Sequence, residues 1–355
     1  MHVGVLTGGG DCPGLNAVIR VVTKALINEC GARVTGIERG FLGLVERRVR
    51  PLDARAVGGI LGQGGTILGT HNRADPFRWF GAGGADVSAQ VLDYLRELGL
   101  DALVAIGGDG TMAIAHRFSQ LGVPVVGVPK TIDNDLMHND RSFGFDSAVA
   151  VVTDAIERLE TTARSHGRVM IVETMGRYAG WIALEAGIAG GADAILIPEI
   201  PYELDALVAL CREREQAQGY TIVCVAEGAK PAGGTLTVQA RLADSPDPLR
   251  LGGVGQVLRA QLEQHLSSEV RATLLGHVQR GGAPTAFDRV LATRFGHAAA
   301  RLVQRGEFGR MVTLQGADCV SVPLAQVAGL NRCVPIDHPL LDTARSLGVS
   351  LGERR

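Results

Sequence analysis

The sequence predicts an α/β protein built from two doubly wound, Rossmann-like α/β domains with mostly parallel sheets. Short apolar runs rich in Val and Ile recur along the chain, and most are followed by a glycine or polar turn and then by a helical pattern. Continuous apolar strands with intervening helices are typical of parallel sheets that are covered on both faces. The length of 355 residues favours two domains, since one domain usually takes about 100–200 residues.

The N-terminal half carries four such strands, which are VGVLT from Val3, ARVTGIE from Ala32, ALVAIGG from Ala102 and PVVGVPKT from Pro124. Helices are expected over 16–28 and from the DGT turn to about 120. Three further strands follow, which are RVMIVET from Arg168, AILIPE from Ala194 and TIVCVAE from Thr221. The turn-rich stretch 230–248 is interpreted as either a linker or a surface hairpin.

Composition excludes several classes of function. The net charge is −2, from 35 basic and 37 acidic residues, so no global field favours nucleic acid or an anionic membrane. The six cysteines show no metal-ligand spacing and are interpreted as reduced thiols. The N-terminal stretch does not resemble a targeting signal, and we find no apolar run near 18 residues. A cytoplasmic location is therefore expected.

Three glycine-rich loops follow strands, and ligands of open α/β sheets bind beyond the carboxyl ends of the strands. Gly8–Gly14 joins a strand to a helix and forms either an anion site or a tight structural turn. Gly107–Thr111, with the sequence GGDGT, is typical of nucleotide phosphate binding, and Asp109 adds a hard oxygen ligand suited to Mg²⁺. The third loop, 62–70, leads to Arg73 and is either a polyphosphate cradle or a mobile surface loop.

Charged side chains that follow the other strands could complete such a site. Asp133 and Asp135 are two residues apart, so in an extended segment their side chains point the same way. A base and a metal ligand are what phosphoryl transfer to an alcohol requires, whereas the alternative is an Asx-rich surface turn. The cations near glycine turns favour phosphate recognition, although each alone could be a solvated charge or a structural histidine. These cations are Arg168, Arg177, Arg271, His277 and Arg280.

Taken together, six segments resemble the 6-phosphofructokinase family. They are GVLTGGGDCPGLNAVIR, GGDGT, PKTIDND, SHGRVMIVETMGRYAG, VAEG and RATLLGHVQRGGAPTAFDR, in the family's order and over most of the first 290 residues. The NAD and diacylglycerol kinases share GGDGT, but they lack TIDND followed by MGR and GHVQRGG. The resemblance implies Mg²⁺-dependent transfer of a phosphoryl group to the 1-hydroxyl of fructose 6-phosphate, giving fructose 1,6-bisphosphate.

The resemblance also implies a role for each candidate residue. Asp133 is the expected general base, Thr131 and Asp135 line the same site, and both Asp135 and Asp109 lie near the metal. Arg73 is expected to bridge the transferring group and Arg177 to steady the acceptor. The donor would lie against Gly10, Gly108, Gly110, Thr111 and Lys130. The sugar phosphate would be held by Arg168, Met175, Gly176, Glu227, Arg271, His277 and Arg280.

In the family, the counterparts of Arg168 and Arg271 reach in from a neighbouring subunit, so a homotetramer with shared active sites is implied. The expected domains interleave: 1–144 plus 279–325 binds the donor ATP, and 145–278 plus 326–355 binds fructose 6-phosphate. The active site would lie in the cleft between them. No partner nucleic acid or membrane is expected.

The donor signature is mixed. ATP-dependent members carry Gly at the position of Gly110, whereas pyrophosphate-dependent members carry Asp there and Lys at the position of Lys130. Steric exclusion is harder to overcome than an extra cation, so ATP is favoured and pyrophosphate is the alternative. Glu160, Gln216 and Gln218 stand where bacterial ATP enzymes have effector-binding cations, although Arg20 and Lys24 keep charge. Weak or absent regulation by ADP or phosphoenolpyruvate is therefore expected.

Two other classes compete with this interpretation. A GGDGT kinase could act on another acceptor such as a lipid or NAD, but no polybasic or amphipathic segment supports a lipid. A non-catalytic sensor of sugar phosphates would not need Asp109, Asp133 and Arg177 together.

Overall fold

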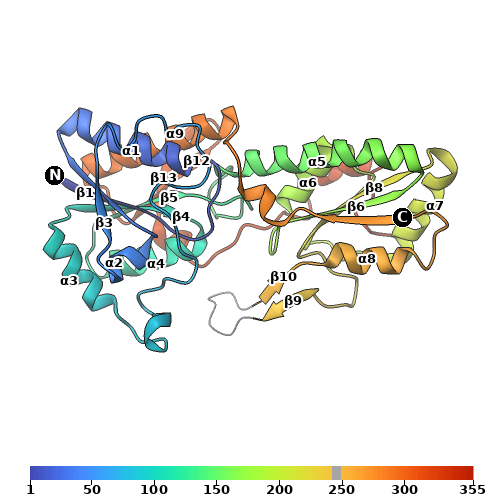
Figure 1. Cartoon of the computed structure of the whole chain (residues 1–355), viewed down its shortest axis with the longest axis horizontal. Helices are drawn as coiled ribbons and strands as arrows, with labels where there is room; N and C mark the ends of the chain where they lie inside the picture. The colour runs from blue at the N-terminus through green and yellow to red at the C-terminus, as the bar shows by residue number, and fades with distance from the viewer. Residues whose placement is uncertain (242–248, 355) are drawn as a thin grey trace. The chain divides into compact units, whose positions relative to one another are not determined.

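The computed structural model describes residues 1–241 and 249–354 and separates the chain into two compact units. Unit 1 comprises Met1–Ile132, Leu136–Ser147 and Arg280–Asn331. Unit 2 comprises Asp133–Asp135, Ala148–Gln279 and Arg332–Arg355. Each unit has its own largely parallel sheet with helices packed on it (Figure 1), so the predicted α/β class with mostly parallel sheets is confirmed.

Unit 1 is built on a seven-stranded sheet with the order β13-β12-β5-β4-β1-β2-β3. Neighbouring strands from β2 to β12 are parallel, while β3 and β13 pair antiparallel at the two edges. The bounds are β1 His2–Thr7, β2 Arg33–Ile37, β3 Val49–Leu52, β4 Ala102–Gly107, β5 Val125–Pro129, β12 Arg310–Gln315 and β13 Asp318–Pro323. Every residue of β1, β4 and β5 is buried, as expected for central strands.

Helices cover this sheet. They are α1 Leu15–Cys30, α2 Phe41–Val45, α3 Ser88–Leu98, α4 Asp109–Gln120 and α9 Ala286–Arg305, with short 3₁₀ turns η1 Phe80–Ala82 and η3 Leu324–Gln326. Helices α1 and α9 pack so closely that a Cβ at Gly296 would lie only 2.1 Å from Val21 Cγ1. Glycine at this position therefore permits the contact. Phe118 and Met112 of α4 are fully buried in the core under the sheet.

Unit 2 has a four-stranded parallel sheet with the order β11-β6-β8-β7. Its strands are β6 Val169–Thr174, β7 Ala194–Leu196, β8 Thr221–Ala226 and β11 Val270–Leu274. Its helices are α6 Trp181–Ala189, α7 Leu204–Ala217, α8 Val254–Leu262 and α10 Pro339–Ser346. Helix α5, Phe145–His166, has its first residues, to Ser147, in unit 1 and the rest in unit 2. The 3₁₀ turn η2, Gly276–Arg280, belongs to unit 2 except for Arg280, which belongs to unit 1.

All seven strands predicted from apolar runs are confirmed as β1, β2, β4, β5, β6, β7 and β8. The helix expected over 16–28 is α1, and the helix ending near 120 is α4. Strands β9 Val238–Arg241 and β10 Leu249–Leu251 pair antiparallel, which favours the hairpin interpretation of 230–248 over the linker; 242–248 lie outside the described residues. Within the described part of the chain, no helix is long and apolar enough to cross a membrane.

Candidate active-site residues

The first glycine loop lies between the end of β1 and the start of α1. Gly14 caps α1 with φ 107°, and a Cβ there would lie 2.7 Å from the Phe143 ring. The amide of Gly8 donates to the carbonyl of Ile106 at 2.9 Å, which joins the loop to the end of β4. Glycine at position 14 is therefore required by the turn itself, because a side chain would be both strained and crowded. The loop lies at the carboxyl edge of the sheet, where anions bind in such folds.

Two cations converge on this loop. Lys130 Nζ donates to the carbonyl of Gly10, and its side chain is almost fully buried. Arg280 Nη1 donates to the carbonyl of Asp11 at 3.2 Å, and a Cβ at Gly10 would lie 2.9 Å from that nitrogen. Burial lowers the pKa of Lys130. The net charge of −2 provides no global attraction for an anion, so a charged ligand needs cations gathered locally, and the structure places Lys130 and Arg280 together at the Gly8–Gly14 loop.

The second glycine loop leads from β4 into α4. Gly108 caps the helix, and Asp109 and Gly110 occupy its first turn with exposed surfaces. A Cβ at Gly107 would lie 2.3 Å from the Thr111 side chain, and a Cβ at Gly8 would lie 2.6 Å from Thr111 Oγ1. The two glycine loops therefore pack against each other around Thr111. Backbone N–H groups at a helix start attract anions, so the exposed first turn of α4 is suited to phosphate.

The third loop, 62–70, is anchored on α1 and on the first glycine loop. Asn16 is almost fully buried, its amide donates to the carbonyls of Gln63 and Gly64 at 3.2 and 3.3 Å, and its Oδ1 accepts from the amide of Ile67 at 2.8 Å. Thr70 Oγ1 donates to the carbonyl of Gly9. These contacts rule against a mobile surface loop. Asn16 was missed, although a polar residue among apolar neighbours of a helix is a signal for such a contact.

Arg73 follows this third loop and is exposed at the surface of unit 1. Its guanidinium carbon lies 5.0 Å from the centroid of the Phe80 ring, and His71 stacks on the same ring at 5.3 Å. A cation over an aromatic face is held loosely enough to turn toward a ligand.

The segment that holds Asp133 and Asp135 is not extended, so the prediction that the two side chains share a direction for that reason is wrong. Asn134 between them has φ 51°, in the left-handed region, which breaks the alternation of a strand. Asp133 and Asp135 are half-buried. Asn134 is only 2% exposed, so the alternative of an Asx-rich turn on the surface does not describe this segment either.

Arg332 secures this turn within unit 2. Its amide donates to the carbonyl of Asp135 at 2.7 Å, and its Nη1 donates to the carbonyl of Asn134 at 3.3 Å. The guanidinium lies 4.4 Å from the Trp181 ring, whose Nε1 donates to the carbonyl of Arg332 at 3.0 Å. No local pattern indicates this role, because Arg332 lies almost 200 residues from the turn in the chain.

The carboxyl ends of β6 and β8 bring together the residues expected to contact the sugar. Thr174 accepts from the amide of Glu227 at 2.9 Å, and Gly176 accepts from the amide of Gly228 at 3.1 Å. Gly176 has φ 129°, and a Cβ there would lie 2.9 Å from the carbonyl of Ala179. Met175, Gly176, Arg177 and Glu227 therefore lie next to one another, as the order of strands predicts.

Two buried polar residues missed by the sequence analysis support this region. Glu173 is 4% exposed, and its carboxylate accepts from the amides of Gly253 at 2.8 Å and Gly255 at 2.7 Å, at the start of α8. Gln279 Oε1 accepts from the amide of Met175 at 3.2 Å, which ties η2, with the exposed His277, to the end of β6. A glutamate inside a run of Val and Ile was the available signal, because buried carboxylates need donors.

Arg168 and Arg271 lie toward the opposite, N-terminal ends of β6 and β11. Arg168 precedes β6, and Arg271 pairs with Met170 in the register of β11 and β6. Both guanidiniums form ion pairs with Glu269. The six residues of β6 span about 20 Å at roughly 3.3 Å each, so Arg168 lies that far from the strand end that η2 contacts. Arg271 lies three residues before the end of β11, which is about 10 Å. Arg280 belongs to unit 1, so the four residues expected to grip one phosphate are not gathered within either unit.

Asp288 links the starts of α9 and α5 behind the first glycine loop. It is fully buried, and its Oδ2 accepts from the amide and hydroxyl of Ser147 at 2.8 and 2.6 Å. Burial raises the pKa of Asp288 to about 6 from 3.8. In the folded protein this group therefore keeps its proton to higher pH than in the unfolded chain, and its contribution to stability is lost as pH rises toward 6.

Replacing Asp288 with asparagine should flatten the pH dependence of stability. The shift from 3.8 to about 6 corresponds to about 3 kcal/mol at roughly 1.4 kcal/mol per pKa unit, and the amide oxygen can still accept from Ser147. We expect Asp288→Asn to lose most of the fall in unfolding free energy between pH 4 and 6.5, measured by urea denaturation. Asp342→Asn, on an exposed site of α10, is the matched control. An unchanged slope in Asp288→Asn would contradict this assignment.

A magnesium site made by the protein alone is not found among residues 1–241 and 249–354, where no three His, Cys, Asp or Glu side chains gather. Mg²⁺ is usually held by one or two carboxylates together with substrate phosphates. Asp109, exposed in the first turn of α4, fits that pattern.

Comparisons with known proteins agree with this geometry. The model of the family "Phosphofructokinase" matches residues 2–303. The chain is 49% identical to ATP-dependent 6-phosphofructokinase 2 of Streptomyces coelicolor, over 98% of this chain and 100% of that protein. It is 51% identical to the pyrophosphate–fructose 6-phosphate 1-phosphotransferase of the same organism, over 94% of this chain and 96% of that protein.

A solved structure extends the likeness to three dimensions. The phosphofructokinase of Pichia pastoris in the T-state superposes with a TM-score of 0.80 at 33% identity, over 92% of this chain. The chain spans 35% of the length of that yeast chain.

Proposed function

Because this chain belongs to the phosphofructokinase family, we propose that it transfers the γ-phosphoryl group of ATP to the 1-hydroxyl of fructose 6-phosphate with Mg²⁺. The product is fructose 1,6-bisphosphate. The observation that carries the proposal is the meeting of two glycine loops with Lys130 at the carboxyl edge of the unit 1 sheet. That arrangement concentrates positive charge and backbone donors where a polyphosphate can bind. Arg280 lies beside the first loop, where it is available to the acceptor phosphate.

The donor binds on unit 1 in this proposal. Gly10, Gly108 and Gly110 let the phosphates approach the backbone, and Thr111 and Lys130 flank them. Asp109 would hold Mg²⁺ together with phosphate oxygens, with Asp135 as a second carboxylate near the metal. When bound, Mg²⁺ supplies charge neutralisation on the transferring phosphoryl group. Arg73 turns from Phe80 to the same group.

The acceptor is held by groups from the ends of β6 and β8 in unit 2. Asp133 takes the proton of the sugar 1-hydroxyl, and Thr131 positions that hydroxyl. Met175, Gly176 and Glu227 contact the sugar, and Arg177 steadies the acceptor side. His277 and Arg280 contact the 6-phosphate. Phosphoryl transfer needs little covalent chemistry from the protein, so its rate depends on this positioning and on electrostatic stabilisation.

The proposal is tested by following fructose 1,6-bisphosphate formation with fructose 6-phosphate, ATP and Mg²⁺. Turnover should require all three, stop on chelation of Mg²⁺ and fall when another sugar phosphate or NAD replaces the acceptor. Product from NAD but not from fructose 6-phosphate would move the chain to another acceptor, and no turnover with any acceptor would favour a sensing role.

Pyrophosphate is the second candidate donor, and Lys130 favours it. The lysine lies against the carbonyl of Gly10 on the donor loop, where an added cation suits a small, highly charged donor. The relative from Streptomyces coelicolor named for pyrophosphate is as similar to this chain as the one named for ATP. Gly110 keeps ATP as the leading donor, because the space beside it is open and nothing lies within 4 Å of its Cβ position.

We also propose that copies of this chain share active sites in a homotetramer. Arg168 lies about 20 Å along β6 from the strand end that η2 contacts, and Arg271 lies about 10 Å from the end of β11, so in this proposal a phosphate at His277 is served by Arg168 and Arg271 of a neighbouring copy. Glu269 holds the two guanidiniums side by side, ready to present their remaining N–H donors.

Mixing two damaged variants tests this sharing. Arg271→Ala and His277→Ala should each raise the KM for fructose 6-phosphate about 10- to 100-fold, the loss of one charge-assisted contact of about 1.5–3 kcal/mol. Hybrids of the two should regain a fraction of intact sites and a low-KM component. Mixtures with Arg158→Ala, on the exposed face of α5, control for general effects. A mixture that shows only the sum of its parts would contradict sharing.

A further inference from the structure

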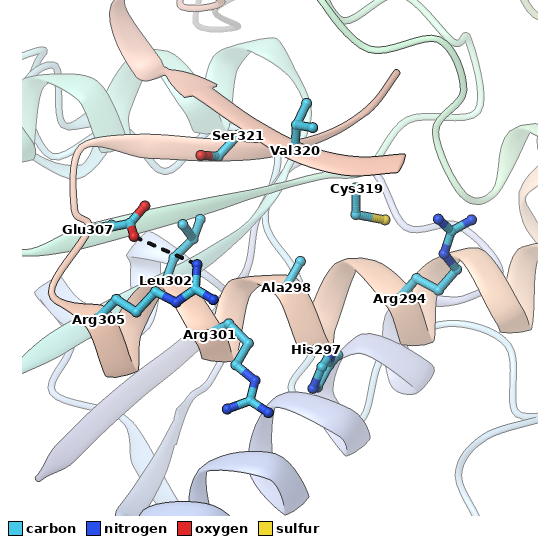
Figure 2. A pocket seen from close by; sticks show the side chains of 10 residues that line it. All are labelled: Arg294, His297, Ala298, Arg301, Leu302, Arg305, Glu307, Cys319, Val320 and Ser321. Carbon is cyan, nitrogen blue, oxygen red and sulfur yellow. Dashed lines mark ion pairs between the residues drawn. The ribbon is translucent and has the colours of Figure 1, made fainter. Parts of the chain in front are cut away.

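A basic groove lies on unit 1 between helix α9 and the edge strand β13, with a cavity volume of about 380 Å³ (Figure 2). It is far along the sheet from the glycine loops, since β13 is an edge strand and the loops follow the central strands β1 and β4. Nothing in the proposed reaction uses this groove. Its volume falls in the range of small-molecule sites.

Three arginines line one side of the groove. Arg294, Arg301 and Arg305 are spaced by seven and four residues, which places them on one face of α9. At about 1.5 Å per residue, they cover about 16 Å of the helix. Figure 2 shows His297 on the same helix between Arg294 and Arg301. A ladder of guanidiniums suits a ligand with more than one anionic group.

The contacts within the protein leave much of this charge available to a ligand. Arg294 Nη2 donates to the carbonyl of Ala317, Arg301 pairs with Glu29 at 3.2 Å, and Arg305 pairs with Glu307 at the long distance of 3.9 Å. A guanidinium carries five N–H donors, so each arginine keeps several for a ligand. Glu29 also lies 4.0 Å from His297, and Asp318 lies at the start of β13.

The remaining lining is mixed, because Glu307 and Ser321 line the groove beside four largely apolar side chains. Leu302 and Ala298 come from α9, and Cys319 and Val320 come from β13, with Val320 39% exposed. A purely inorganic anion would gain nothing from these walls, whereas a ring or a ribose could pack on them.

We propose that this groove binds a small organic polyphosphate, such as a nucleoside diphosphate, at a site separate from the donor site. The phosphates lie along Arg294, Arg301 and Arg305, because the planar guanidinium fork matches phosphate oxygens. The apolar part of the ligand packs on Leu302 and Val320. The location of this site rests on α9 and β13 alone, whereas a count of two ADP molecules per chain rests on the proposed function, because the other ADP would occupy the donor site.

Calorimetric titration of the full chain with ADP at low ionic strength tests the proposal. We expect two ADP molecules per chain, and one in the double variant Arg301→Ala/Arg305→Ala. The double variant should keep its turnover within about twofold at saturating substrates, because neither residue lies in the proposed catalytic site. Arg158→Ala, which removes an exposed guanidinium from α5, should keep both sites. Arg305→Ala alone, with 67% of its side chain exposed, serves if the double variant fails to fold.

A second variant should act in the opposite direction. Glu29→Gln removes the carboxylate that neutralises Arg301 and should tighten the second ADP site about 3- to 10-fold, while the first site is unchanged. ADP should also slow alkylation of Cys319, read residue by residue by mass spectrometry, and inorganic tripolyphosphate should do so less. The same number of ADP molecules per chain in the wild type and in Arg301→Ala/Arg305→Ala would overturn the proposal, whereas one ADP in the wild type and none in the double variant would contradict only the nucleotide donor site. Equal protection of Cys319 by tripolyphosphate would show that the groove recognises the phosphates alone. It would overturn the proposal that an apolar part of the ligand packs on Leu302 and Val320.

Discussion

Replacing Asp133 with serine should lower kcat by about 10²- to 10⁴-fold, the usual worth of a positioned general base, while fructose 6-phosphate still binds. The half-buried Asp133 lies in the turn that Arg332 secures, so the backbone of the variant should keep its place. Loss of the base removes an interaction made in the transition state, so kcat should fall far more than the affinity for the acceptor.

Steady-state kinetics and equilibrium dialysis with labelled fructose 6-phosphate measure the two quantities separately. Asp140→Ser is the matched control, since Asp140 is exposed seven residues further on and accepts from the amide of Gly316 at 2.7 Å. The control should turn over within about twofold of the wild type. Turnover like that of the wild type in Asp133→Ser would remove Asp133 as the base.

Introducing aspartate at Gly110 should reduce kcat/KM for ATP by at least about 100-fold, because a like charge set against the donor phosphates costs several kcal/mol. The protein itself can accept this side chain. No atom lies within 4 Å of the Cβ position, and Gly110 is exposed in the first turn of α4, where a carboxylate is favourable. The melting temperature should therefore stay the same or rise slightly.

Gly110→Ala separates charge from bulk, since it adds the same Cβ without the carboxylate. We expect less than a tenfold loss with ATP for this control. The pyrophosphate-supported rate of Gly110→Asp, if the wild type has one, should fall much less than its ATP rate. An ATP rate that survives in Gly110→Asp would show that this position does not select the donor.

The central strands could be predicted because their sequences already carry the cause of their burial. Runs such as Val3–Thr7 and Thr221–Ala226 are largely apolar at successive positions. This pattern is expected of a parallel strand whose two faces are both covered by helices. The edge strands β3 and β13 were not predicted, because partly exposed strands alternate with polar residues and look like loops. Their place in the sheet depends on pairing with distant segments.

The candidate site likewise combines features that the local sequence predicts with features that depend on distant segments. The glycine loops were predicted because the strand, the turn and the helix start are contiguous in sequence. The burial of Lys130 and the support given by Glu173 could not be predicted, since their partners, Gly10 and the start of α8, lie about 80–120 residues away. The expectation that Asp133 and Asp135 lie in an extended segment was wrong because of Asn134 between them. Asparagine adopts the left-handed backbone conformation at little cost. The roles assigned to individual side chains stay predictions.

The most direct test of the central claim compares ATP with pyrophosphate as donors to fructose 6-phosphate under saturating Mg²⁺, with kcat/KM measured for each. We expect ATP to support turnover with a kcat/KM that exceeds that of pyrophosphate by at least about tenfold, because Gly110 leaves room for a nucleotide. Turnover with pyrophosphate alone would contradict this and would make the buried Lys130 the residue that marks the donor.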